Sequence, residues 1–173
     1  MAKGEFFLKN MPRGSGLRGM ASFYPGADVG AIEVFSALLN ISSELLSAIN
    51  SSLSRHGTSQ ARFRLLLMLR LAGERGLHPS ELAETLRVER ASVTGLVDGI
   101  EREGLARRVA SEEDRRSVTV LLTPKGRRFI DSLAPLRLRK VAELMCCLSA
   151  AEQKTLVKLL DRLNANMPAF RKI

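Results

Sequence analysis

The chain of 173 residues contains only two cysteines and two histidines, and they form no common cluster. Cys146 and Cys147 are neighbours in a helical pattern, where successive side chains point about 100° apart, so we expect no structural disulfide between them. His56 and His78 have no cysteine or other histidine nearby, which argues against a zinc site. We therefore expect no metal site and no cofactor, and the cysteine usage fits a reducing compartment.

The sequence also has no long uninterrupted apolar run. No stretch approaches the roughly 20 consecutive apolar residues that span a bilayer. The first ten residues, MAKGEFFLKN, do not contain the apolar core of a signal peptide, because Lys9 interrupts the short apolar stretch before it. These absences predict a cytoplasmic protein with no membrane partner.

No catalytic motif stands out either. We find no Ser/His/Asp set, phosphate-binding loop or paired-carboxylate motif, and we therefore expect no enzyme activity. What the chain does have is basic charge, with 27 Lys and Arg against 18 Asp and Glu and a net charge of +9. The excess is spread along the chain, so it gives only moderate support for a polyanionic partner, and motifs must decide.

Hydrophobic spacing predicts a mainly α protein with a small β-hairpin. Apolar residues recur at helical spacing over residues 28–55, 58–72, 79–86, 90–103, 123–148 and from residue 149 towards the C-terminus. The spacing changes to alternation at residues 105–110 and 117–123, which predicts two strands joined by a polar connector. Pro135 should kink the helix that contains it. Residues 1–27 have many glycines and no periodicity, and we interpret them as an irregular N-terminal arm.

The two short helices at 79–86 and 90–103 have the pattern of a helix-turn-helix. This motif needs a small residue where its helices touch and apolar residues at fixed positions around it. Ala83 fits the small position, and the five expected apolar positions are all filled, by Leu82, Leu86, Val88, Val93 and Leu96. Arg87 stands where the turn usually has glycine. A positive φ at this arginine would cost on the order of 1 kcal/mol.

The second helix of this motif would present its N-terminal residues to DNA. Arg90 could reach guanine edges or phosphates, whereas Ser92 and Thr94 are short and less selective hydrogen-bonding groups. Gly95 would let the backbone approach closely without reading a base. The alternative is an ordinary solvated helix face.

The polar connector between the strands carries the sequence Asp114-Arg115-Arg116. An arginine at the tip of a hairpin suits the narrow and strongly negative minor groove of DNA. A carboxylate two residues away can hold that arginine extended through a charge-assisted hydrogen bond. The alternative is a salt-bridged surface turn. Together with the helix pair, the hairpin predicts a winged helix-turn-helix.

The sequence resembles the multiple-antibiotic-resistance regulator (MarR) family. The residues that carry this resemblance are Ser80-Glu81-Leu82-Ala83, Ser92-Val93-Thr94, Leu96-Val97-Asp98, Glu103-Gly104-Leu105, Asp114-Arg115-Arg116 and Leu122-Thr123-Pro124-Lys125-Gly126. The resemblance implies a transcriptional regulator that binds double-stranded DNA. It also implies a homodimer built from the first and the last two helices, binding a roughly palindromic operator, usually as a repressor released by a small ligand or an oxidant.

The resemblance also implies a role for each matching residue. Arg116 would enter the minor groove, Asp114 would orient it, and Arg115 would lie nearer a phosphate. Facing the major groove would be Arg90, Ser92 and Thr94, and Ser80 and Gly95 are further candidates for DNA binding. The chain departs from the family pattern where Glu89 replaces a common serine and where Gly95 and Gly99 replace frequent arginines. Residues 58–123 would form the DNA-binding domain, and residues 28–57 and 124–173 the dimerisation region.

Two further sets of residues are candidates for regulation. The family's effector pocket would correspond to Phe35, Leu39, Phe63, Leu67 and Phe129, which are equally compatible with ordinary core. Cys146 and Cys147 could sense oxidants or bind a soft metal, although buried packing is the favoured interpretation. A winged helix used for protein contact is the competing class, and it would not need the basic wing tip.

Overall fold

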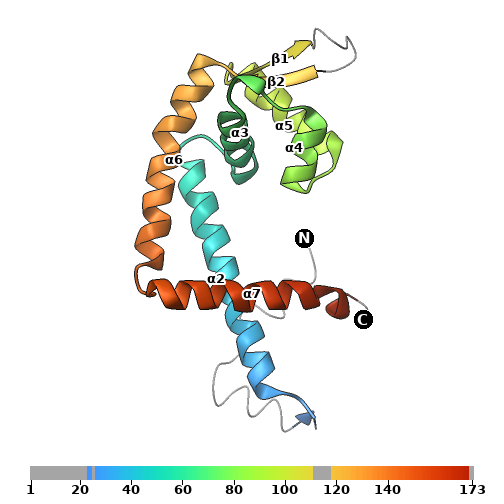
Figure 1. Cartoon of the computed structure of the whole chain (residues 1–173), viewed down its shortest axis with the longest axis vertical. Helices are drawn as coiled ribbons and strands as arrows, with labels where there is room; N and C mark the ends of the chain where they lie inside the picture. The colour runs from blue at the N-terminus through green and yellow to red at the C-terminus, as the bar shows by residue number, and fades with distance from the viewer. Residues whose placement is uncertain (1–22, 25, 111–117, 172–173) are drawn as a thin grey trace. The chain divides into compact units, whose positions relative to one another are not determined.

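The computed structural model describes residues 23–24, 26–110 and 118–171 (Figure 1). In chain order the elements are α2 (Val29–Ser54), α3 (Gln60–Ala72), the short 3-10 helix η1 (Gly73–Arg75), α4 (Pro79–Leu86), α5 (Arg90–Arg102), β1 (Ala106–Ala110), β2 (Val118–Leu122), α6 (Pro124–Met145) and α7 (Ala150–Phe170). The predicted mainly α fold with one β-hairpin is confirmed. The chain divides into two compact units, residues 1–64 and 65–173, which are described separately below.

The first unit consists of α2 and the start of α3. Asp28 caps α2 as predicted, because its carboxylate accepts a hydrogen bond of 3.0 Å from the backbone N–H of Ala31. The helix ends at Ser54, and Gly57 follows in the left-handed region with φ +68°. The hydroxyl of Ser59 then accepts a hydrogen bond from the N–H of Arg62 and begins α3.

Helix α2 is long and apolar enough to cross a membrane by length and composition. Its most apolar 18-residue window has a mean hydropathy of 1.4. The expectation from the sequence concerned only uninterrupted apolar runs, and this averaged measure selects α2 although it contains no such run. One such helix is weak evidence, since many helices that pack in proteins pass the same test. Glu33, Asn40, Glu44 and Asn50 interrupt the apolar residues of α2 at intervals. That pattern fits a helix with an apolar face for another helix better than a fully lipid-exposed span.

The core of the second unit forms around α3. Leu65, Leu66 and Leu69 are almost completely buried, as the apolar centre of this helix predicts, while Leu67 and Met68 are only partly buried. The remaining core side chains come from elements along the rest of the unit and include Leu82, Leu86, Val93, Val97, Ile100, Val120, Ile130 and Leu133. One apolar core therefore supports both short helices and the hairpin.

The hairpin is antiparallel and is extended by a short third segment. Residues of β1 and β2 pair in the register Ala106↔Leu122 to Ala110↔Val118. Leu77 forms a further bridge with Val120, with hydrogen bonds of 3.1 and 2.9 Å in the two directions. Gly76, just before it, has φ +64°, and a Cβ there would lie 2.6 Å from the carbonyl oxygen of Val120. This segment, which was not predicted from the sequence, ties the start of α4 to the wing.

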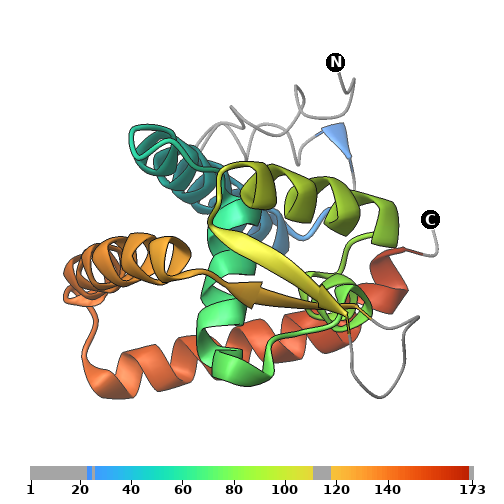
Figure 2. The same ribbon diagram turned by 90° about the horizontal axis from the view of Figure 1, so that it is seen from above.

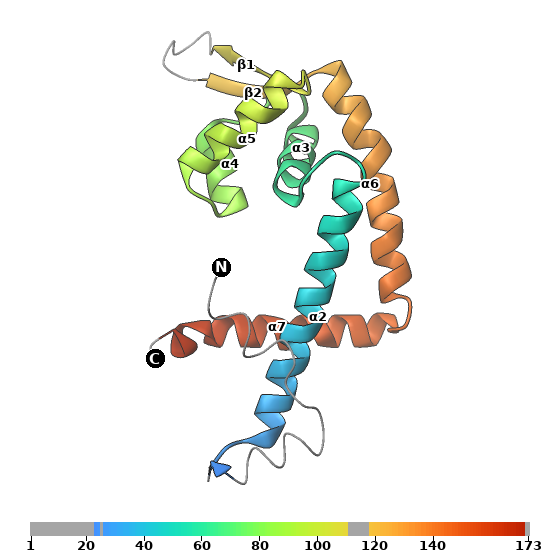
Figure 3. The same ribbon diagram turned by 180° about the vertical axis from the view of Figure 1, so that it is seen from behind.

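Helix α6 leaves the end of β2, as the views from above and from behind show (Figures 2 and 3). Thr123 caps it and Pro124 occupies its first turn, as predicted. The helix continues through Pro135 and ends at Met145, three residues before the predicted end. Ser149 and Glu152 form the predicted capping box of α7. Every described residue of α7 is exposed.

Candidate nucleic-acid interface

The predicted helix-turn-helix is formed by α4, a three-residue turn and α5. Arg87 ends α4 in the left-handed conformation, with φ 55° and ψ 47°, so the strained arginine that the sequence suggested is present. The turn is closed by hydrogen bonds of 3.1 Å from the N–H of Arg87 to the carbonyl of Glu84 and from the N–H of Val88 to the carbonyl of Ala83. This left-handed step turns the chain sharply from α4 into α5.

The two helices meet through the predicted small and apolar side chains. Leu82, Ala83, Leu86 and Val93 are all buried, whereas Val88 is 42% exposed and contributes little to the core. The opposite face of α5 is open to solvent at its N-terminal end, where Arg90, Ser92, Thr94 and Gly95 are exposed. Ser80, in the first turn of α4, is exposed as well.

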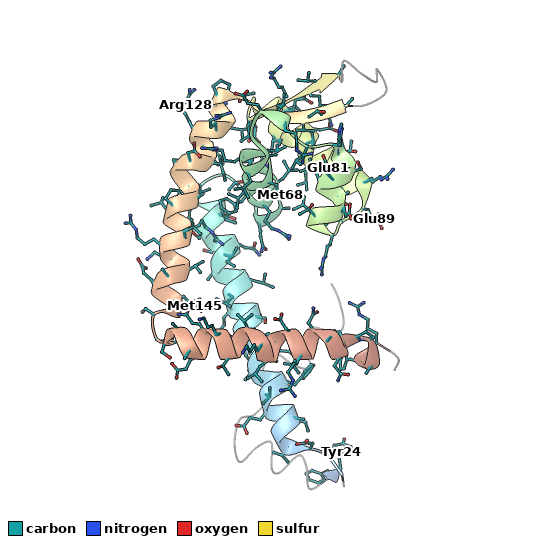
Figure 4. The ribbon with its side chains drawn as sticks, in the orientation of Figure 1. Tyr24, Met68, Glu81, Glu89, Arg128 and Met145 are labelled. Atoms are coloured by element: carbon teal, nitrogen blue, oxygen red, sulfur yellow. The ribbon has the colours of Figure 1, made fainter. Side chains whose placement is uncertain are left out.

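The exposed groups of α5 differ in how free they are to bind. The hydroxyl of Thr94 donates a hydrogen bond of 3.1 Å to the carbonyl of Arg90, so this side chain offers mainly an acceptor. Arg90 forms no ion pair within the described part of the chain and can extend outwards. Glu89, labelled with Glu81 in Figure 4, precedes α5 without capping it through its side chain. The predicted wing-tip residues Asp114, Arg115 and Arg116 lie outside the described residues.

Hydrogen bonds to Arg75 and to the strand β2 hold the start of α4 in place. The carboxylate of Glu81 accepts hydrogen bonds from the backbone N–H of His78 at 2.7 Å and from the guanidinium of Arg75 at 3.1 Å. The bond from His78, assisted by the one from Arg75, lowers the pKa of the Glu81 carboxyl. The ring nitrogen Nδ1 of His78 donates to the carbonyl of Val118 at 3.1 Å, which joins the start of α4 to the start of β2.

An ion-pair cluster that was not predicted from the sequence joins α5 to β1. The guanidinium of Arg108 contacts Asp98 at 2.6 Å and Glu101 at 2.5 Å. Glu101 also accepts the backbone N–H of Arg108 at 2.9 Å. The hydrogen bond that the guanidinium donates to Asp98 is the main reason that the pKa of Arg108 is raised. A sequence signal existed, since two acids three residues apart on one helix face preceded an arginine in the next strand.

The C-terminal end of α5 is held by residues at the start of α6. The hydroxyl of Thr123 donates to the carbonyl of Gly104 at 2.6 Å, and the ammonium of Lys125 donates to the carbonyl of Glu103 at 2.7 Å. Gly126 packs so closely that a Cβ would lie 1.9 Å from the carbonyl oxygen of Leu105. The Leu-Thr-Pro-Lys-Gly motif thus fixes the end of α5 to the next helix and satisfies its terminal carbonyls.

The residues predicted for regulation, namely the pocket residues and the two cysteines, differ in burial and lie in different parts of the chain. Phe63 is buried, Leu39, Leu67 and Phe129 are partly buried, and Phe35 is 38% exposed; the set is divided between the two units. The effector pocket therefore stays a prediction. Cys146 and Cys147 are exposed in the single chain, so the expected burial is wrong there. Each thiol donates to the carbonyl three residues earlier. Among the described residues, no group of three or more His, Cys, Asp or Glu could hold a metal.

The fold and this interface define a winged helix-turn-helix protein. The family model described as the MarR family matches residues 56–117. The HTH-type transcriptional repressor YetL of Bacillus subtilis is 30% identical over 164 residues, which cover 95% of this chain and 98% of YetL. The chain therefore belongs to the MarR family of transcriptional regulators.

Solved structures agree with this assignment. The apo form of MarR from Escherichia coli is 27% identical, with a TM-score of 0.59 over 71% of this chain and 90% of MarR. MepR of Staphylococcus aureus, in a crystal structure of a MepR–DNA complex, is 21% identical, with a TM-score of 0.67 over 73% of this chain and 92% of MepR. The likeness to MepR shows the shared fold.

Proposed function

We propose that this protein is a cytoplasmic, homodimeric repressor that binds a palindromic operator in double-stranded DNA. The observation that carries the proposal is the two-sided character of α5. Val93, Val97 and Ile100 are buried on one side, while Arg90 and Ser92 are exposed at the N-terminal end of the other. A helix supported in this way can lie in the major groove. The repressor name of YetL and the DNA complex of MepR support the same reading.

In this proposal, α5 contacts the major groove of the DNA and the wing contacts the minor groove. Arg90 contacts guanine or phosphate, and Ser80, Ser92, Thr94 and Gly95 line the close approach to the groove. Arg116 enters the minor groove, and the carboxylate of Asp114 orients it while Arg115 contacts a phosphate. Residues 58–123 act as the DNA-binding domain.

A second copy of the chain accounts for the apolar surface of the helices outside that domain. Helix α7 exposes a row of apolar side chains, namely Leu156, Leu159, Leu160, Leu163 and Met167. A solvated helix with such a face buries it against another element, and a two-fold partner gives the symmetry that a palindrome matches. Residues 28–57 and 124–173 form the dimerisation region in this proposal. A small effector that binds the protein would release the operator.

The experiment that tests this function begins by selecting duplexes from random DNA with the wild-type protein. Changing Arg116 to Ala should weaken binding to the selected duplex by about 1–3 kcal/mol, because a desolvated minor-groove contact is lost. The control is Lys154→Ala, which removes an exposed charge from α7. Titrations by fluorescence anisotropy at several salt concentrations would measure both affinity and salt dependence, and affinity should fall steeply as salt rises.

The outcomes separate the proposal from its competitors. Failure to select any duplex, or an affinity that neither Arg116→Ala nor salt affects, would favour a winged helix used for protein contact. The selected duplex also serves to screen metabolites for release. Release by an oxidant that disappears when Cys146 and Cys147 are both replaced by Ser would favour the redox-sensing alternative over the small-ligand one.

A further inference from the structure

Among the hairpin residues that the structure describes, only Arg108 forms ion pairs with two carboxylates of α5. Its two terminal nitrogens are divided between Asp98 and Glu101, and its backbone N–H donates to the second oxygen of Glu101. Glu101 therefore binds Arg108 through both the side chain and the main chain. The three side chains are roughly one-third to one-half exposed, so the cluster lies at the surface of the domain.

The position of this cluster connects the two parts that would meet DNA. Asp98 lies one turn after Thr94 in α5, whose exposed end carries Arg90 and Ser92. Arg108 lies in β1, the strand that leads directly into the connector with Asp114, Arg115 and Arg116. A planar guanidinium shared by two acids fixes direction as well as distance, which a single lysine contact would not do.

We propose that Arg108, Asp98 and Glu101 are positioning residues that lock β1 against α5, so that the wing and α5 engage DNA together. This inference rests on the proposed DNA-binding function and adds to it. With both carboxylates occupied, Arg108 is not itself a DNA contact. Its charge also offsets two acids on a helix that faces a polyanion, and loss of the arginine would leave Asp98 and Glu101 free to repel phosphates.

The first experiment measures coupling between the cluster and the wing tip. The duplex selected by the wild-type protein is titrated with Arg116→Ala, Arg108→Met and the double variant. Met keeps the apolar stem of the arginine and removes only the charged head. Arg116→Ala alone should weaken binding by about 5- to 150-fold. In the Arg108→Met background the same change should weaken binding by only about 3-fold or less, because a wing that is no longer held in place gains little from its arginine.

Conservative variants and a matched control separate positioning from a general effect on stability. Arg108→Lys should restore part of the affinity, because an ammonium can pair with only one carboxylate at a time. Arg107→Met removes a neighbouring exposed strand arginine that makes no ion pair within the described ranges, and its effect should be additive with that of Arg116→Ala. Thermal unfolding of each variant corrects the affinities for the fraction of folded protein.

A second measurement tests the cluster without DNA. Hydrogen exchange at the backbone N–H of Arg108 should speed up at least several-fold in Glu101→Ala, which removes the acceptor, while the N–H of Val120 in β2, which bonds to Leu77, should be unaffected. Unchanged exchange at Arg108 would overturn the inference. Additive costs in the Arg108 and Arg116 cycle would also overturn it while leaving DNA binding intact. If the wild-type protein selected no duplex at all, the proposed function would fail and the inference with it.

Discussion

At the scale of single residues, close packing requires glycine at position 126, whereas nothing in the structure requires it at position 99. A Cβ at Gly126 would lie 1.9 Å from the backbone oxygen of Leu105, a distance that only movement of the backbone can relieve. A Cβ at Gly99 would meet nothing within 4 Å, and its φ is not in the left-handed region. Both glycines lie in helices, so a comparison of alanine substitutions at the two positions separates the effect of packing from that of helix propensity.

We expect Gly126→Ala to destabilise the protein by about 1–3 kcal/mol, because α6 must move away from the end of α5. Gly99→Ala should instead stabilise it by up to about 1 kcal/mol, because alanine favours a helix and nothing obstructs its methyl group. Urea unfolding followed by circular dichroism measures both. Equal effects of the two substitutions would show that the close contact at Gly126 is absent in solution.

Residue-scale features were also the hardest to predict from the sequence. The left-handed Arg87 could be anticipated, because an arginine stood where the turn normally has glycine. The cluster of Asp98, Glu101 and Arg108 was missed because spacing within one helix does not say which strand residue will face it. The close approach of Gly126 depends on the path of the chain after α5, which no local pattern encodes. Contacts between elements need the fold as well as the sequence.

At the scale of elements, local rules predicted the boundaries of the helices well. The start of α4 at Pro79 and its end at Leu86 agree with the prediction, as do the capped starts of α2, α6 and α7. Caps and glycines act within one turn, so the sequence carries them directly. The bridge between Leu77 and Val120 was missed, because a single strand residue has no alternation to detect.

The anchoring of α4 makes domain stability depend on pH. The pKa of Glu81 is lowered in the folded protein by the N–H of His78 and by Arg75, so the folded state favours the charged carboxylate. The sign follows from linkage: this stabilisation is fully present above the carboxyl pKa of the unfolded chain, about 4.3. It is lost as the pH falls through the lower pKa of the folded state. Because the side chain is about one-third exposed, its contribution is about 1 kcal/mol or less.

We therefore expect Glu81→Gln to lower the melting temperature at neutral pH and to lose this effect in acid. The variant keeps a hydrogen-bond acceptor but loses the charge, so its deficit against the wild type should shrink below about pH 4. Glu84→Gln, an exposed acid in the same helix, is the control for a change in net charge. A Glu81→Gln deficit that stayed constant from neutral pH to pH 3 would contradict the assigned role of the carboxylate.

At the scale of the whole molecule, a single chain does not explain why α7 exposes a row of apolar side chains. None of its described residues is buried, yet its apolar side chains recur at positions 156, 159, 160, 163 and 167 on one helical face. The apolar spacing after residue 149 predicted the helix that carries this face, but spacing alone could not say what covers it. Within the proposed function, the partner is a second copy of the chain.

Breaking this face should convert the protein to monomers and thereby weaken operator binding. Leu160→Asp places a charge in the centre of the row, and burying that charge in a dimer would cost several kcal/mol unless the dimer dissociates. Because Leu160 is 41% exposed in the single chain, the substitution should leave the fold of the monomer intact. Sedimentation velocity measures the change in mass, and circular dichroism checks the fold.

The matched control is Lys158→Asp, which introduces the same side chain on the opposite side of α7. It should remain dimeric and bind the selected duplex with little change beyond the effect of lost positive charge. A monomeric Leu160→Asp should bind a palindromic duplex no more tightly than a duplex with a single half-site, because the second half-site adds affinity only when one molecule spans both. A Leu160→Asp variant that sediments with the mass of the wild type would place the dimer contact elsewhere and leave the apolar face of α7 to another partner.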